Sequence, residues 1–305
     1  MAVSYTTSDF LTAVQLRGSI PATTNTSNVN NTTNLLLLGT DELLIKLLPL
    51  LMSAREEFYV THADYTISQN QASYPIPYRA VGQVVRDIHI LNGNAVYKLA
   101  PIQREYLTTT TTGDVLGYYF EGNNIVLYPT PGSSTQGTLR VGYFRRPSQL
   151  AQTSSCAQIT AVSLSTNTVT VSAYPSSWGI GTVVDFIHAL PPYDCPGIDY
   201  TITGISGSNI TFSSLPTDAL GNSLVYANDW LALAEYTPIP QVPREFQPVL
   251  AQMVVVRVLK SQGDAAAVQM AQQELQMMQG AALGMVTQRD EGAGKKVVGR
   301  NWYRR

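Results

Sequence analysis

Residues 243–286 read PREFQPVLAQMVVVRVLKSQGDAAAVQMAQQELQMMQGAALGMV, and this stretch decides how the chain folds. Its apolar residues recur every three or four positions, which is the spacing of an amphipathic helix. Gly263 and Asp264 interrupt the pattern, so we expect two antiparallel helices joined by a short link. Pro243 sits where the first turn of the first helix tolerates a proline. The expected core positions are Phe246, Leu250, Met253, Val254, Val258 and Leu259, then Val268, Ala271, Leu275 and Met278.

The N-terminal residues predict further helices that could pack against this hairpin. Ser8 is a candidate N-cap for a helix over residues 9–17, and Thr40 is a candidate N-cap for a second helix. Residues 22–34, which are nearly all Thr, Asn and Ser, are expected to form a loop between them. Pro49 should kink or restart the second helix. Its expected core residues are Leu43, Leu44, Leu47, Leu48 and Leu51.

Between the helical ends the hydrophobic period falls towards two, which indicates strands. The expected strands lie at 65–67, 84–91, 118–120, 125–128 and 138–144. Gly122 to Asn124 predict a tight turn, and a short helix is expected to begin near Pro101. Residues 155–233 carry a further series of short strands, which is typical of a small barrel or sandwich.

These patterns predict an α+β protein. A helical bundle with β-strands and a hairpin would receive an inserted small all-β domain, and an extended C-terminal tail would follow. The expected parts are an N-terminal helical and β core at 1–154, the inserted all-β domain at 155–233, a helical hairpin completing the bundle at 234–286 and a docking tail at 287–305.

Composition excludes several classes of protein. Charged residues make up 13% of the chain, against roughly 25% in an average protein, and the net charge is −2. That balance argues against bulk electrostatic binding of nucleic acid. Cys156 and Cys195 are too few for a disulfide framework. Charges and Pro49 break the apolar stretch 35–52, and the N-terminus has no signal-peptide pattern, so we expect a soluble intracellular product without a membrane partner.

A search for catalytic motifs predicts no enzyme. His62, His89 and His188 are scattered, and the last two fall inside expected strands (84–91 and 182–190), where a hydrogen-bonded, half-buried imidazole is the usual case. Residues 204–208 lack the spacing of a nucleophile elbow, and residues 179–181 lack the third glycine of a dinucleotide site. We therefore expect no catalytic, cofactor-binding or metal site, and no cofactor.

The C-terminal residues 287–305 are the most informative segment for function. They combine six basic residues, two acidic residues and three glycines with the pair Trp302 and Tyr303. A glycine-rich, aperiodic segment should not pack on its own body, whereas aromatics beside arginines are typical of interface hot spots. We predict an arm that becomes ordered on a partner; the alternative is a frayed tail whose aromatics rest on the neighbouring helix. Its docking residues would be Arg289, Lys295, Lys296, Arg300, Asn301, Trp302, Tyr303, Arg304 and Arg305.

Several stretches, taken in order, resemble the head-to-tail adaptor (connector) proteins of tailed bacteriophages. The resemblance covers most of the chain in its order of elements. The stretches are YPIP at 74–77, RDI at 86–88, GYYFEGNNIVLYP at 117–129, LRVGYFRRP at 139–147, Asp229-Trp230, Pro243-Arg244-Glu245, the helix pair split at Gly263-Asp264, and GRNWYRR at 299–305.

The resemblance implies a structural protein of the virion neck, assembled in the bacterial host cytoplasm. Twelve copies would form a ring beneath the portal, the C-terminal tail would reach the portal protein, and the β domain would face neighbouring copies or a downstream tail protein. Packaged DNA would pass through without sequence-specific binding. One alternative is a tail-tube, tail-completion or capsid-accessory (decoration) protein. Another is a carbohydrate-binding or enzymatic spike component, with Trp178, Tyr193, Asp194 and Asp199 as candidate residues.

Overall fold

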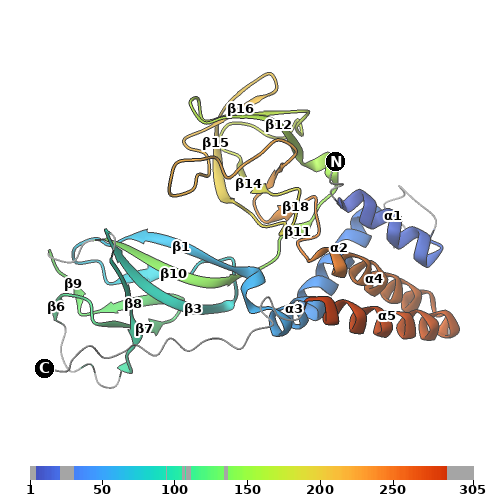
Figure 1. Cartoon of the computed structure of the whole chain (residues 1–305), viewed down its shortest axis with the longest axis horizontal. Coiled ribbons are helices and arrows are strands. Elements are labelled where there is room, and N and C mark those ends of the chain that lie inside the picture. The colour runs from blue at the N-terminus through green and yellow to red at the C-terminus, as the bar shows by residue number, and fades with distance from the viewer. Residues whose placement is uncertain are drawn as a thin grey trace, which may run out of the picture. The chain divides into compact units, whose positions relative to one another are not determined.

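The computed structural model describes residues 5–20, 31–93, 95–104, 107, 111–133 and 137–286. Two compact units divide the chain (Figure 1): one combines Met1–Arg55 with Ser148–Arg305, and the other is Glu56–Pro147. Helices and strands both contribute substantially, which confirms the α+β class. The boundaries expected at 154, 233 and 286 stay predictions, and the expected tail lies outside the described residues.

The first unit contains a helical bundle built from both ends of the chain. Its central helix is α4, where ten of sixteen residues are buried because α1, α2 and α5 all pack against it. Gly263 ends α4 with a left-handed backbone (φ 80°), and this confirms the predicted helical hairpin. The helices are α1 (Thr7–Gly18), α2 (Thr32–Glu42), α3 (Leu48–Ala54), α4 (Gln247–Gln262) and α5 (Ala265–Val286).

The cap of α1 differs from the one expected at Ser8. The helix begins at Thr7, and the Thr6 side chain accepts a hydrogen bond from the backbone N–H of Asp9. The Asp9 carboxylate in turn accepts from the backbone N–H of Thr6 at 2.8 Å. This reciprocal capping box pairs backbone N–H groups at both of its positions, so it outcompetes a cap at Ser8.

The start of α2 was also predicted wrongly. The helix begins at Thr32 with Asn31 as its N-cap, and Thr40 lies buried near its C-terminal end. The Thr40 hydroxyl donates to the carbonyl of Leu36 and accepts from the backbone N–H of Leu150, both at 3.0 Å. The hydroxyl that was expected to cap a helix therefore accepts a hydrogen bond from a residue 110 positions further along the chain.

Pro49 restarts the helix, as its missing N–H predicts. The chain widens into a π-helical turn over Leu43–Leu47, and α3 then begins at Leu48 with Pro49 in its first turn. Four of the five predicted core leucines are buried here, and Leu44 is half-buried.

The short strands after residue 155 close into a six-stranded barrel, which decides between the two expected arrangements. Neighbouring strands are antiparallel and follow the order β12-β13-β16-β15-β14-β17. Buried apolar side chains, among them Phe186, Ile202 and Phe212, fill the interior. The strands are β12 (Ala157–Ser163), β13 (Thr168–Val171), β14 (Val183–Ile187), β15 (Gly197–Ser206), β16 (Asn209–Phe212) and β17 (Trp230–Leu233).

A parallel pair, β11 (Gln149–Leu150) with β18 (Tyr236–Thr237), connects the barrel to the helices. Asp185, fully buried on β14, holds the neighbouring turn in place. Its carboxylate accepts from the backbone N–H groups of Asp199 and Glu235, each at 3.0 Å. Both donors have left-handed backbones (φ 61° and 68°), so one carboxylate holds two unfavourable backbone conformations.

The second unit packs two four-stranded sheets face to face around Ile88, Ile125, Leu127, Leu139 and Val141. The first sheet has the order β1-β10-β3-β4, with β1 (Val60–Thr66), β10 (Thr138–Arg145), β3 (Ala80–Asn92) and β4 (Ala95–Lys98). The second has the order β2-β8-β7-β5, with β2 (Ser73–Pro75), β8 (Asn124–Tyr128), β7 (Gly117–Glu121) and β5 (Ala100–Pro101). A small pair joins β6 (Thr112–Gly113) to β9 (Thr130–Pro131).

Pro101 does not begin the helix expected near it, and a 3-10 turn comes slightly later, at Arg104. Pro101 lies on the edge strand β5 and pairs in parallel with Tyr118 of β7. An edge position suits proline because it has no N–H to donate to a further strand. The tight turn predicted at Gly122 is confirmed as the β7–β8 hairpin, where Gly122 has φ 58°.

Candidate interaction surfaces

The face of α5 that points away from the bundle is exposed, carries three methionines and has almost no charge. Met270, Met277 and Met285 are exposed to 67%, 70% and 70%. Residues 265–286 contain one charged side chain, Glu274, which accepts from Arg17 of α1 at 3.3 Å and from Gln252 of α4 at 3.1 Å. An exposed helix face that carries methionines and has its single charge tied to the bundle is typical of a protein-covered surface.

The bundle exposes apolar side chains on other elements too. Leu16 of α1 is 77% exposed, and Ile45 of the π-helical turn is 72% exposed. Figure 1 shows α1 and α5 on different sides of α4. The bundle thus exposes apolar side chains both on α5 and on α1 with the π-helical turn.

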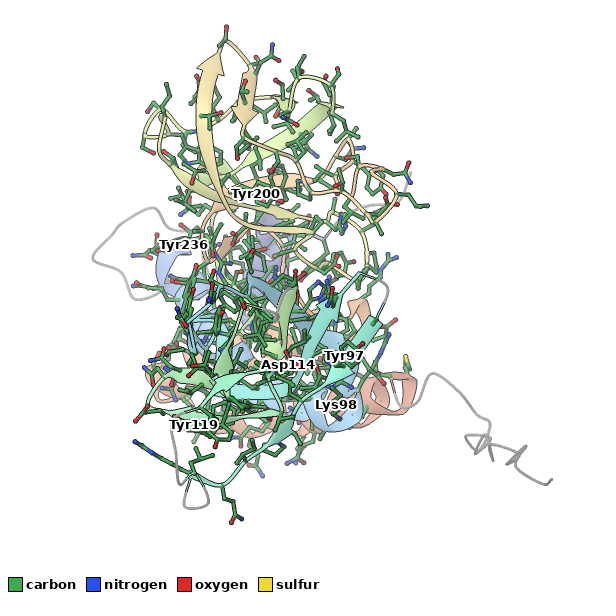
Figure 2. The ribbon with its side chains drawn as sticks, turned by 90° about the vertical axis from the view of Figure 1, so that its left-hand side faces the viewer. Tyr97, Lys98, Asp114, Tyr119, Tyr200 and Tyr236 are labelled. Carbon is green, nitrogen blue, oxygen red and sulfur yellow. The ribbon has the colours of Figure 1, made fainter. Side chains whose placement is uncertain are left out.

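A groove of about 380 Å³ lies in the same unit, between α2, β11, the end of β17 and β18. Three of its apolar side chains, Leu37, Leu233 and Tyr236, are still exposed to 43%, 36% and 38%. Figure 2 labels Tyr236, below the barrel strands. None of the described residues that line the groove is charged; they are Thr33, Leu36, Leu37, Gln149, Leu150, Ala151, Gln152, Ser155, Leu233 and Tyr236.

Charge is distributed unevenly along the sequence. Residues 148–243 contain six acidic residues and no Lys or Arg, whereas residues 287–305 contain six basic and two acidic residues. The remaining residues balance, with thirteen of each sign. The barrel segment therefore carries a formal charge of −6 and the C-terminal segment one of +4.

His188 takes part in a structural bridge within the barrel unit. Its Nδ1 lies 3.0 Å from Asp229, and the Asp229 carboxylate also accepts from the backbone N–H groups of Ala189 and Tyr226. Burial lowers the pKa of His188, but the hydrogen bond to Asp229 and the charges of Asp229 and Asp194 outweigh it and raise the pKa. These bonds fasten the loop after β14 to the segment before β17.

The residues considered for a carbohydrate site do not gather into one. Trp178 is buried in the barrel core, and Tyr193 is buried in a separate cluster with Ala189 and Ile239. Asp194 lies close to His188, whereas Asp199 donates its backbone N–H to Asp185. No shared aromatic and acidic platform results among these four residues.

The other two histidines lie on the outer face of the first sheet of the second unit. His89 is 3.4 Å from Asp87, and His62 lines the same shallow pocket of about 340 Å³. Nearby, Arg140 donates twice to Asp64, at 2.8 and 2.7 Å, and this pairing lowers the pKa of Asp64. On the adjacent strand β4, Figure 2 labels the exposed Tyr97 and Lys98.

The described part of the chain contains no group of three or more His, Cys, Asp or Glu side chains arranged to hold a metal ion. No described helix is long and apolar enough to cross a membrane.

The nine residues predicted to form the docking tail all lie outside the described residues, so their role stays a prediction. Sequence reasoning missed the methionine face of α5 and the groove. The signal for the first was available, because residues 265–286 contain only one charged residue. The groove had no comparable signal, since its lining comes from three separate stretches of sequence, 33–37, 149–155 and 233–236.

The helical bundle exposes apolar helix surface, which is typical of a protein that binds other proteins. The family model of the SU10 adaptor protein matches residues 5–178, which is more than half of the chain. The chain therefore belongs to this family of phage adaptor proteins, and it is a structural component of the virion that binds other virion proteins. A comparison with curated proteins finds no match.

Proposed function

We propose that this adaptor is a head-to-tail connector subunit, which forms a ring beneath the portal and joins the DNA-filled head to the tail. Family membership supports the adaptor role. The observation that carries the ring is the exposed face of α5, with Met270, Met277 and Met285. Fully burying one such side chain stabilises a contact by about 1.5–3 kcal/mol, so three of them could support association between subunits.

A closed ring requires two different contact patches on each subunit. Head-to-tail contact between identical subunits joins two different patches of the same chain, and the ring closes when the rotation between subunits allows it. The α5 face supplies one patch, and Leu16 with Ile45 supply exposed apolar surface on other elements. We propose that these surfaces meet between neighbouring copies, twelve to a ring, in the virion neck after assembly in the host cytoplasm.

The other partners follow from the distribution of charge. The basic arm at 287–305 docks on the portal protein, and twelve arms on one ring add their contacts through avidity. The barrel meets a neighbouring copy or a downstream tail protein. Packaged DNA passes without sequence-specific binding, and its phosphates are held weakly because the net charge is −2 and residues 148–243 contain no Lys or Arg.

Electron microscopy of the protein alone and mixed with its portal tests the proposal directly. A twelve-fold ring, formed or stabilised by the portal, is the expected result. The variant Met270→Asp/Met277→Asp should lose the ring, whereas Leu116→Asp, at a 72% exposed position of the second unit, should keep it. A stacked tube would point to the tail-tube alternative, and a monomer indifferent to the portal would overturn the proposal.

A further inference from the structure

We propose that the groove between α2, β11, β17 and β18 holds the chain's own C-terminal segment before assembly, with Trp302 and Tyr303 against its apolar walls. The inference rests on the proposed function, because the same segment is expected to dock on the portal. It adds a second partner for that segment and a step in which the two partners compete.

The walls of the groove suit aromatic side chains. Its volume of about 380 Å³ falls within the range of about 300–1,000 Å³ typical of binding pockets. Leu37, Leu233 and Tyr236 contribute apolar surface that is still more than a third exposed. A Trp or Tyr side chain can bury about 150–250 Å², so the Trp302–Tyr303 pair could cover this surface.

The acidic residues that neighbour the groove lining in sequence complement the charge of the segment. Asp41 follows Leu37 by one turn on α2, and Glu235 directly precedes Tyr236; both acids are exposed. The four elements that form the groove contain no Lys or Arg. The aromatic pair, in contrast, is flanked by Arg300 on one side and by Arg304 and Arg305 on the other. Each exposed pairing of opposite charge is weak by itself, and several act together.

The composition of the undescribed segments of the first unit, which contains the groove, favours this occupant. Residues 1–4 and 21–30 contain neither an aromatic nor a charged side chain, whereas residues 287–305 supply both. The 16 residues from Val286 to Trp302 span about 50 Å when extended, compared with about 30 Å for the diameter of a small domain. Because the segment is tethered, its effective concentration at the groove is about millimolar, and a weak contact suffices.

The consequence is ordered assembly. In an isolated subunit the groove shields the aromatic pair from solvent and from unrelated partners. A portal that binds the segment more tightly draws it out, and by linkage a better groove contact weakens portal docking by the same factor. The arm is then presented where a portal is available to receive it.

Disulfide trapping in the full-length chain tests the contact. The background carries Cys195→Ser, and Cys156 stays reduced because burial raises the pKa of its thiol to about 12. Leu37→Cys and Asn301→Cys are then introduced together and mildly oxidised. The matched control pairs Asn301→Cys with Ser165→Cys, at the exposed β12–β13 turn. We expect the groove pair to close within one chain at least tenfold faster than the control pair.

Charge reversal and salt sharpen the result. Asp41→Lys with Glu235→Lys should slow closure of the groove pair several-fold, as should 1 M salt, because both remove the attraction between these acidic residues and the segment. Equal rates for the groove and control pairs, or disulfides formed only between chains, would overturn the inference.

A portal-binding assay on the same proteins separates this inference from the proposed function. Trapping without any portal docking would leave the groove contact standing and remove the portal role of the arm. Portal docking without trapping would remove the groove contact and leave the portal role of the arm standing. If both hold, the trapped disulfide should block docking and its reduction should restore docking.

Discussion

The two helices of the C-terminal hairpin pack against each other and yet have opposite surroundings. α4 is enclosed by α1, α2 and α5, and the run from Val249 to Val256 is buried without a break. α5 is longer, but only Ala271 and Ala282 are buried in the subunit. Both helices are rich in apolar residues, so the difference lies in where the covering surface comes from. α4 is covered by its own chain, whereas the described part of the chain leaves the methionines of α5 exposed.

The largest expected effect tests the enclosed helix. Leu250→Ala removes a fully buried side chain from α4, and we expect a loss of about 2–5 kcal/mol in the free energy of unfolding. The control, Met277→Ala on the exposed face of α5, should stay within about 0.5 kcal/mol. Denaturant unfolding of both variants measures the contrast. Similar losses would mean that α5 is covered within the subunit after all.

The next prediction concerns the exposed helix α5, where substitutions should affect association rather than the stability of the subunit. Met270→Asp with Met277→Asp should leave unfolding of the subunit nearly unchanged, because both side chains already face solvent. Association should weaken at least tenfold, because two charges would then have to be buried without partners. Analytical ultracentrifugation measures association, and hydrogen exchange in α5 reports whether its amides gain protection in the ring. Unimpaired association would exclude this face as the subunit contact.

A smaller effect is expected at the polar link between the helices. Glu274→Ala removes the acceptor for Arg17 and Gln252, but the carboxylate is about half exposed. We expect a loss of about 1 kcal/mol or less in the free energy of unfolding. Glu274→Gln should recover part of it because an amide oxygen can still accept. A loss as large as that of Leu250→Ala would show that this ion pair, rather than packing, holds α5 in place.

The smallest effect lies outside the hairpin, which contains no histidine. The pKa of His188 is raised in the folded protein by Asp229 and Asp194 despite burial, so folding favours its protonated form. Its contribution is fully present below the unfolded pKa of about 6.5 and is lost as pH rises through the higher folded pKa. His188→Gln should remove this component from a plot of Tm against pH. An unchanged plot would mean that the bridge to Asp229 is not charged.

The sequence predicted regular elements well where local signals and the final packing agreed. The α4–α5 spacing, the link at Gly263 and the barrel strands all follow from periodicity and turn residues. It failed where a distant contact decided the outcome. Thr40 beside Asp41 and Glu42 resembled a helix start, but its hydroxyl pairs with Leu150.

The candidate surfaces show the same limit. Helical spacing predicted a core stripe on α5, yet both of its faces are rich in apolar and small residues, so the pattern alone could not show which face remains uncovered. The groove could not be predicted from the sequence, because three separate stretches of the chain line it and no motif marks them. The docking tail came from composition alone and lies outside the described residues.

Closure of the barrel affects which surface substitutions such subunits can accept during evolution. A closed sheet has no edge strand, so its backbone offers no template for pairing with another chain, even among many copies at high local concentration. Contacts made by the barrel therefore depend on its side chains. Those side chains can be replaced during evolution to suit a new partner without opening a route to fibre formation. Substitutions on the Ser-, Thr- and Asn-rich, cation-poor surface of the closed barrel can therefore change which partner it binds while the protein stays soluble.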